Sequence, residues 1–340
     1  MGMQVPFPNF ISACPKPGLA VLTNANLIEA NVKDSPETRW NIYLRTEDRS
    51  KDFVVERLHA LLLSDSLVPT FPAAAMKLCA LAQNESTRME DVGQVVAADA
   101  GLAARCVQIA SSIGFAARPI ESINQALMLI GLAQVRRVAL AVAAIDTFAD
   151  IGPAVDWQRY WMHNVLVGRL TELVAGTFRK TTGVEYLAGL LHDAGKLIIE
   201  QYFPEQSAQI IAQAEARKCG HIDVELELLG ISHAQIGAAL CESMRVHPHI
   251  LRAVWYHHDP LAASHTGDAA GDGGFLAASI AIADRLANRA KVGLIDRPAE
   301  VVEKSPEWAF LQTLAVPRKI EIDLAFEVER AEKDVRAFLA

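Results

Sequence analysis

An adjacent histidine and aspartate interrupt an apolar stretch near the middle of the chain, Leu190-Leu191-His192-Asp193-Ala194-Gly195-Lys196-Leu197. Burying two ionisable side chains costs free energy unless they are paired or bind a cation. Neighbouring side chains on a helix point about 100° apart, so His192 and Asp193 can share an ion only if other segments supply further ligands. Taken alone, the pair is more simply explained as a half-buried histidine whose ring is held by the aspartate. A metal site therefore requires a fold that brings distant ligands to this segment.

The composition favours an all-α protein. The chain has 340 residues, of which 51% are hydrophobic and only 6% aromatic. Alternating strand patterns are scarce, and residues with high helix propensity prevail. The formal net charge of −8 argues against a general affinity for nucleic-acid backbones. We expect a globular helical protein with no direct nucleic-acid partner.

The apolar periodicity divides the chain into four segments. Residues 1–52 form an N-terminal arm of unknown role, 53–150 an N-terminal helical bundle, 151–292 a helical subdomain that carries the candidate ligands, and 293–340 a C-terminal helical tail. Helices are predicted at 53–62, 72–84, 90–98, 101–112, 122–131, 133–149, 157–177, 184–201, 205–218, 221–229, 233–245, 248–257, 275–290 and 324–339. A Gly- and Ser-rich loop is predicted at 262–274. The alternating charges of the last helix indicate a solvated outer face.

The five cysteines lie far apart and form no CxxC pair, which favours a reduced cytoplasmic setting. The N-terminus lacks the basic start and apolar run of a secretory signal. The longest strongly apolar run, Val138–Ile145, is far too short to span a bilayer. We expect a cytoplasmic protein with no membrane partner, and the sequence leaves its oligomeric state open.

Further candidate ligands gather in the second helical group. They are His163, His233, His257, His258 and Asp284. Asp284 is the most telling, because a carboxylate within an apolar helix should be buried only if it is paired or binds a cation.

This set is large enough for two divalent ions such as Fe, Mn or Zn, which imidazole and bridging carboxylate ligands suit. One division places the first ion among His163, His192, Asp193 and Asp284. Asp193 then bridges to a second ion held by His233, His257 and His258. Lys196, at i+3 from Asp193, can meet the same site and orient a phosphate. Asp193 and Lys196 are the candidate catalytic residues.

Each member also has a simpler explanation. His163, beside Trp161 and Met162, can be an ordinary helix-face histidine. His257 and His258 can form an exposed helix end, where a positive charge is favourable. Lys196 can be a helix-surface cation. The recurrence of such residues along one helical domain favours a metal site over coincidence.

The order of these residues resembles the HD superfamily of metal-dependent phosphohydrolases, most closely its HD-GYP branch and the related HDOD domain. Residues 99–105, 109–115, 119–126 and 129–131 resemble the HDOD signature stretches, as do Gly189–Lys196 and Gly230–Gly237. The likeness covers about residues 55–290.

The resemblance implies an all-helical HDOD module of bacterial signalling and regulatory proteins, many of which lack demonstrated catalysis. The chain departs from the HD-GYP branch, because the Gly-Tyr-Pro signature is missing and Gly271-Asp272-Gly273-Gly274-Phe275 echoes it only faintly. Arg159 stands where some metal-rich relatives carry an acidic ligand, and its charge would repel a third cation.

Three functions remain open. The first is a signal-transduction module with an HD-type divalent-metal site that senses a nucleotide ligand or docks a signalling protein. The second is a metal-dependent phosphohydrolase acting on a nucleotide or cyclic dinucleotide. The third is a non-catalytic helical scaffold.

Overall fold

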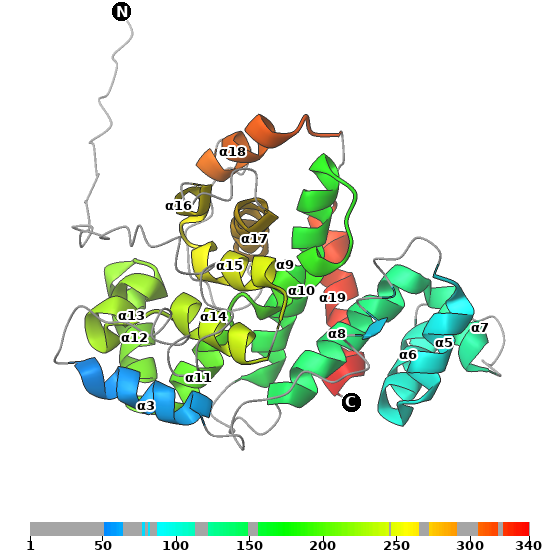
Figure 1. The fold of residues 1–340 in the computed structure, drawn as a ribbon, viewed down its shortest axis with the longest axis horizontal. Coiled ribbons are helices and arrows are strands. Elements are labelled where there is room, and N and C mark those ends of the chain that lie inside the picture. Colours follow the sequence, from blue (N-terminus) through cyan, green and yellow to red (C-terminus); the bar gives the residue numbers. More distant parts are fainter. Residues whose placement is uncertain are drawn as a thin grey trace, which may run out of the picture.

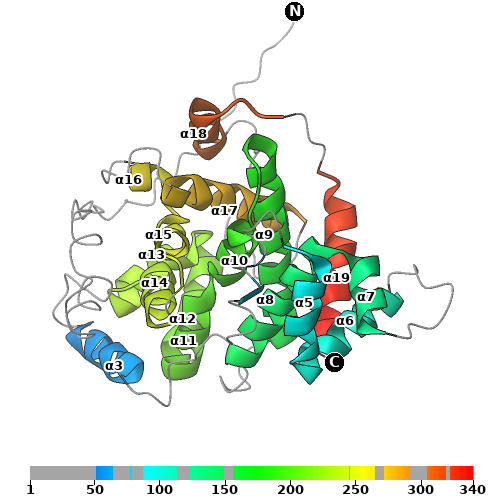
Figure 2. The same ribbon diagram turned by 45° about the vertical axis from the view of Figure 1, so that its right-hand side comes forward.

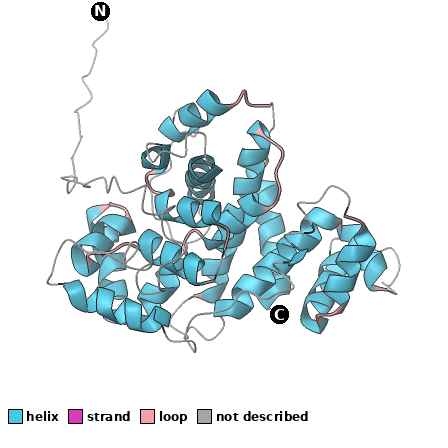
Figure 3. Ribbon diagram, in the orientation of Figure 1, coloured by secondary structure: helices cyan, strands magenta, loops and turns pink. Residues whose placement is uncertain are grey.

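The computed structural model describes residues 51–63, 77–78, 81, 87–112, 122–148, 156–244, 246–264, 272–290, 305–318 and 322–339. Every regular element within these ranges is a helix (Figure 3), which confirms the all-α fold class. The N-terminal arm up to residue 50, most of the helix predicted at 72–84, and the predicted boundaries near residues 150 and 292 lie outside the described residues.

Most predicted helices are present with small shifts at their ends. The helices are α3 (Asp52–Leu63), α5 (Met89–Ala97), α6 (Ala100–Ser112), α7 (Ile123–Ile130), α8 (Leu132–Phe148), α9 (Trp157–Phe178), α10 (Val184–Leu191), α11 (Ala194–Tyr202), α12 (Pro204–Arg217), α13 (His221–Leu229), α14 (His233–Ser243), α15 (Pro248–Tyr256), α16 (Pro260–Ser264), α17 (Asp272–Arg289), α18 (Pro306–Leu314) and α19 (Leu324–Leu339). Local capping residues define several starts: Ser122, Asp156, Ser232 and Ser305 each accept a hydrogen bond from a backbone amide of the first turn.

The helix α9 runs through the centre of the molecule and packs against α10, α17 and α19 (Figures 1 and 2). The helix has buried side chains along much of its length, including Trp161, Leu166 and Leu170. A helix buried on several sides needs apolar residues around most of its circumference, as this one has. This central helix therefore connects the candidate ligands to the rest of the fold.

The helices α5 to α8 form a group beside this centre, at the right of Figure 1. Gly131 joins α7 to α8 at a φ of 77°, a conformation that favours glycine. Within the described residues, no single helix has both the length and the apolar composition to cross a bilayer. The pair α7 and α8, up to Ile145, meets those criteria only when the two are taken together, and they are bent by 105°.

Outside the candidate site, two features differ from the sequence-based expectations. The predicted loop at 262–274 is partly helical, because α16 extends to Ser264 and α17 begins at Asp272. The helix α18 was not predicted; its Ser305 cap and Pro306 at the first helical position are the local signals that specify it. The outer face of α19 is solvated as expected, since Glu329 and Lys333 are exposed; its inner face buries Glu327 and Asp334 against α8 and α9.

Candidate metal centre

The chain breaks between α10 and α11 at the His192-Asp193 pair. The continuous apolar stripe predicts one helix over 184–201, and this prediction is wrong. Asp193 has φ −102° and ψ 11°, outside the helical region, so the chain direction changes at this residue. Two adjacent side chains that an unbroken helix would separate by 100° thereby face one centre.

Close backbone contact positions α14 against the start of α11. A Cβ atom built on Gly195 would overlap the carbonyl oxygen of His233 and lie 2.8 Å from the amide nitrogen of Gly237. Since only glycine leaves this space open, the two helix starts can approach closely. This contact brings His233 next to Asp193.

A second glycine contact positions α9 against α10. A Cβ atom on Gly189 would lie 2.6 Å from Thr171 Oγ1 and 2.8 Å from Gly168 Cα. The small residues allow the two helices to cross closely, and the rings of His163 and His192 consequently lie 5.4 Å apart between their centroids.

The two carboxylate oxygens of Asp193 face two different sets of histidines. Its Oδ2 lies 3.4 Å from His192 Nε2 and 3.8 Å from His163 Nε2. Its Oδ1 lies 3.3 Å from His233 Nε2 and 3.8 Å from His257 Nε2. Asp193 thus stands between two groups of ring nitrogens, as a bridging carboxylate must.

Asp284 and His258 complete the two groups. Asp284 Oδ1 is 3.2 Å from His163 Nε2, and His258 Nε2 is 2.8 Å from His233 Nε2. The ligand atoms within each group lie within 4.8 Å of one another; the groups are His163, His192 and Asp284, and Asp193, His233, His257 and His258. The structure therefore brings together all seven residues that the sequence predicts as metal ligands. Only His258 among them is more than marginally exposed.

Backbone carbonyls hold two of the rings in one orientation. His192 Nδ1 lies 2.8 Å from the Gly189 carbonyl oxygen, and His257 Nδ1 lies 2.6 Å from that of Val254. Because a carbonyl can only accept, each Nδ1 carries the hydrogen and each Nε2 presents its lone pair to the centre. This is the arrangement typical of histidines that bind metals.

Glu225 orients the third ring and is a residue that the sequence analysis missed. Its carboxylate lies 2.6 Å from His233 Nδ1 and also accepts a hydrogen bond from the His233 backbone amide at 2.8 Å. The signal was present, since Glu225 precedes Leu229 by one turn on the buried side of α13. A carboxylate on a buried helix face calls for a partner.

Burial and neighbouring charge set the protonation of the centre. Burial, together with the neighbouring histidines, holds the pKa of His257 well below its ordinary value, and burial also lowers the pKa of His192. Burial opposes ionisation of Asp193, but His192, Lys196 and His233 overcome it and hold its pKa well below the usual range. His192 and His257 are therefore neutral beside an ionised Asp193, and neutral imidazole and carboxylate are the donors that a divalent cation prefers.

The Asp284 side of the centre has a similar balance. Burial opposes the charge on both His163 and Asp284. The contact between these two side chains outweighs burial, raising the pKa of His163 and lowering that of Asp284. Asn288 Nδ2 donates to Asp284 Oδ1 at 3.2 Å, a supporting contact that the sequence analysis did not predict.

The residues present fit a metal. Asp193 Oδ1 is buried and accepts no hydrogen bond in the structure, although His233 Nε2 lies 3.3 Å away. A buried carboxylate oxygen without a hydrogen bond is costly, and a cation would satisfy it.

Lys196 and Arg159 lie in different surroundings. Lys196 Nζ is 2.8 Å from Asp193 Oδ2, so the predicted catalytic pair is in direct contact. Arg159 is exposed in the first turn of α9, one turn before His163.

The ion-free protein is expected to lose stability as pH rises toward 10. Burial lowers the pKa of His233, but the charge of Glu225 and the contacts of its two ring nitrogens with the Glu225 and Asp193 carboxylates outweigh burial and raise the pKa from 6.5 to about 9. A pKa raised by folding gives stability that is fully present below 6.5 and is lost as pH rises through about 9. Urea unfolding in chelator should show a pH-dependent loss of a few kcal/mol, about 1.4 per pKa unit. The His233→Gln variant should lack this pH-dependent loss. Equal pH slopes of stability in the wild type and the variant would contradict the role given to His233.

Comparison with known proteins places this arrangement among related chains. A model of the HDOD domain family matches residues 68–260, which is more than half of the chain. Asp284 lies beyond the matched range. An uncharacterized protein of Treponema pallidum (strain Nichols) is 22% identical over 200 residues, covering 56% of this chain and 38% of that protein. The chain thus spans well under half the length of that relative.

Solved structures share the fold. An HDOD domain protein of unknown function from Geobacter sulfurreducens has a TM-score of 0.65 and 23% identity, covering 85% of this chain and 96% of that one. A protein named for a proposed role in signal transduction, from Marinobacter aquaeolei VT8, has a TM-score of 0.62 and 20% identity, with coverage of 92% and 69%. One named as a candidate phosphohydrolase, from Shewanella amazonensis SB2B, has a TM-score of 0.55 and 22% identity, with coverage of 84% and 97%. At these identities the likeness concerns the fold.

Proposed function

Because the chain belongs to the HDOD domain family, we propose that it is a bacterial signal-transduction module whose helical core holds a divalent-metal centre of the HD type. The observation that carries this proposal is the position of Asp193, with each of its carboxylate oxygens directed to a different group of histidine Nε2 atoms. The name of the Marinobacter structure supports the signalling part.

The centre connects elements that are far apart in the sequence. Its seven residues come from α9, α14, α17, the junction of α10 with α11, and the end of α15 with the residues that follow it. A cation held by these side chains would fix the helices relative to one another, because binding free energy that exists only in the folded state adds to its stability. Metal occupancy would therefore change the stability of the helical core, as is expected of a regulatory element.

The cytoplasm is the proposed location of the module. Burial raises the pKa of the Cys106 and Cys241 thiols to about 12, so both are protonated and unreactive at neutral pH. Inert buried thiols suit a protein of a reducing compartment.

Metal addition is expected to stabilise the chelator-treated protein strongly. Mn²⁺ or Zn²⁺ at one hundred times its Kd should add about 2.7 kcal/mol per occupied site to the free energy of unfolding, by mass action. Differential scanning calorimetry of the wild type and of Asp193→Ala checks this, since the variant should show no metal-dependent shift. An equal shift in both proteins, or none in the wild type, would refute the proposed centre.

A second candidate function, phosphodiester hydrolysis, is favoured by Lys196. Its ammonium lies 2.8 Å from the bridging carboxylate, and both Lys196 and His258 are more exposed than the other cluster members. Bound divalent ions would supply an activated water at this place. Lys196 would hold a phosphate oxygen and balance the charge that develops on it.

Hydrolysis of bis(4-nitrophenyl) phosphate and of cyclic dinucleotides tests this candidate. Activity should disappear in His192→Ala and Asp284→Ala while circular dichroism shows an intact helical fold. Turnover retained in both variants, or no turnover by metal-loaded wild type, would exclude hydrolysis at this centre and leave the regulatory module.

A further inference from the structure

The C-terminal helix α19 bridges the helical group α5 to α8 and the central helix α9. It packs on α6, α8 and α9 (Figure 2), and we call the surface that it covers there the α19-binding face. The matched HDOD residues 68–260 include all three helices of this face and end before α19. The helix that covers the face therefore comes from outside the matched family region. Its inward residues recur at helical spacing and are Leu324, Glu327, Val328, Ala331, Asp334 and Val335.

Polar contacts on the α19-binding face select carboxylates. Arg169 on α9 is buried, with Nη2 2.6 Å from Glu327 Oε2 and Nη1 3.3 Å from Asp334 Oδ2. On α8, Gln134 Nε2 donates to Asp334 Oδ1 at 2.9 Å. Glu327 and Asp334 are seven residues apart, so two turns of helix place them on one side. A helix that fits this face must present two carboxylates at this spacing beside its apolar stripe.

Buried ion pairs specify such a partner more than they strengthen its binding. Taking guanidinium and carboxylate groups out of water costs much of the free energy that their attraction returns. The apolar contact of α19 is also small, since Ala331 and Val335 are buried but Leu324 and Val328 are half-buried. The contact is therefore specific in its charges and modest in its apolar area, as is expected of a helix that can be exchanged.

The fit of α19 to this face is electrostatically imperfect. Arg330 lies in the chain between the two acidic residues, and burial together with the charge of Arg169 lowers the pKa of Arg330. Burial also raises the pKa of Asp334, although Arg169 opposes this change. Both shifts mean that the charged forms are less favourable here than in water. A helix with a neutral residue in place of Arg330 would fit better.

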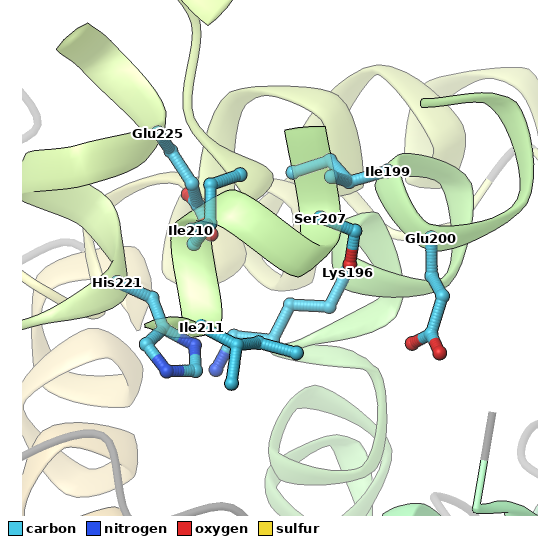
Figure 4. Close-up of a pocket in the computed structure, with 8 residues that line it drawn as sticks. All are labelled: Lys196, Ile199, Glu200, Ser207, Ile210, Ile211, His221 and Glu225. Atoms are coloured by element: carbon cyan, nitrogen blue, oxygen red, sulfur yellow. The ribbon is translucent and has the colours of Figure 1, made fainter. Parts of the chain in front are cut away.

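We propose that the α19-binding face is a docking site for an acidic amphipathic helix of a partner protein, with α19 as an internal competitor. The partner helix presents two carboxylates seven residues apart and displaces α19. Because α19 bridges α9 and the α5 to α8 group, its displacement would change how that group is held. The purpose of docking rests on the proposed signalling role. The face itself involves neither the metal ligands nor the pocket in Figure 4, which is lined by α11, α12 and α13.

A labelled peptide of residues 322–339 is the probe, and fluorescence anisotropy measures its binding to the full chain. In the wild type α19 competes at an effective concentration on the order of mM, so the peptide should bind weakly. The double variant Glu327→Gln, Asp334→Asn loosens α19 without changing the face. Its Kd for the peptide should be at least about 10-fold lower than that of the wild type. Equal Kd values, or no binding to the folded double variant, would overturn the proposal.

Peptide variants test the specificity of binding to the double-variant chain. Neutralising Glu327 and Asp334 in the peptide should raise the Kd at least about 10-fold. The matched control, Glu329→Gln at an exposed position, should leave the Kd within about 2-fold. Arg330→Gln in the peptide should lower the Kd at least about 3-fold, because the repulsion from Arg169 is removed. A Kd raised by Arg330→Gln, or unaffected by loss of both acidic groups, would contradict the proposed contacts.

Hydrogen exchange in the wild type tests displacement without any substitution. If α19 leaves the face reversibly, its amides should exchange together and at least about 10-fold faster than those of α9. Exchange of α19 only with global unfolding would overturn the proposal. A wild-type dimer that the variant Glu327→Gln, Asp334→Asn does not form would identify α19 of a second copy as the occupant, and would also overturn it.

Failure of this proposal can be told apart from failure of the metal centre. Peptide binding by a double-variant chain that takes up no metal would refute the metal centre alone. Metal uptake by a chain that binds no peptide would refute the docking face alone. Because the two sites use different residues, chelator should leave the Kd for the peptide within about 2-fold.

Discussion

Replacing Gly195 with alanine is expected to lower the free energy of unfolding by about 3 kcal/mol. Two effects oppose each other at this position. Alanine improves helix propensity by up to about 1 kcal/mol, but its methyl group would overlap the carbonyl oxygen of His233. The overlap is with backbone of a buried helix start, which cannot move without separating α11 from α14. The steric effect therefore decides the sign.

The control for this substitution is Gly176→Ala on α9. Its Cβ would meet only Thr181 Cγ2, at 3.7 Å, which is ordinary van der Waals contact. We expect Gly176→Ala to be neutral or to stabilise by up to about 1 kcal/mol. Urea unfolding of both variants makes the comparison, and metal affinity should fall only in Gly195→Ala, where His233 is displaced. Equal stability of the two variants would contradict the packing described here.

Replacing Arg169 with methionine is expected to destabilise the protein by about 3–5 kcal/mol. The guanidinium is buried, with Nη2 2.6 Å from Glu327 Oε2 and Nη1 3.3 Å from Asp334 Oδ2. Gln134 also donates to Asp334, at 2.9 Å. Removing the cation leaves two buried carboxylates without their main partner, and these contacts hold α19 against α8 and α9.

A variant in which all three side chains are neutral tests whether uncompensated charge causes this loss. The triple variant Arg169→Met, Glu327→Gln and Asp334→Asn should recover much of the loss, because no uncompensated charge remains. Lys333→Met breaks the exposed pair with Glu329 and should leave the urea midpoint unchanged. A loss in the triple variant as large as in Arg169→Met alone would show that charge is not what holds α19.

The sequence predicts helices and ligands well because both depend on local patterns. Apolar periodicity marks α9 and α17, and Asp284 is noticeable because it interrupts an apolar face. The break at His192-Asp193 could not be predicted in this way, since the apolar stripe continues through it. It depends on the contact of Gly195 with α14, which lies about forty residues further along the chain.

The sequence also does not indicate which charged residues of the last helix have buried partners. The last helix has acidic and basic residues in alternation, which indicates a solvated face, and Glu329 and Lys333 are indeed exposed. Glu327 and Asp334 differ from them only in facing Arg169, a partner more than 150 residues away in the chain. Long-range pairing of this kind has no local signal, because burial decides which charges need a partner.

The number of metal ions bound by the variants tests the central claim most directly. If Asp193 bridges two sites, elemental analysis of the wild type loaded with Mn²⁺ should give two ions per chain, and Asp193→Ala should give none. Asp284→Ala and His258→Ala each remove a ligand from one group only, so each should retain about one ion. Two ions retained in Asp193→Ala, or none in the wild type, would contradict the account.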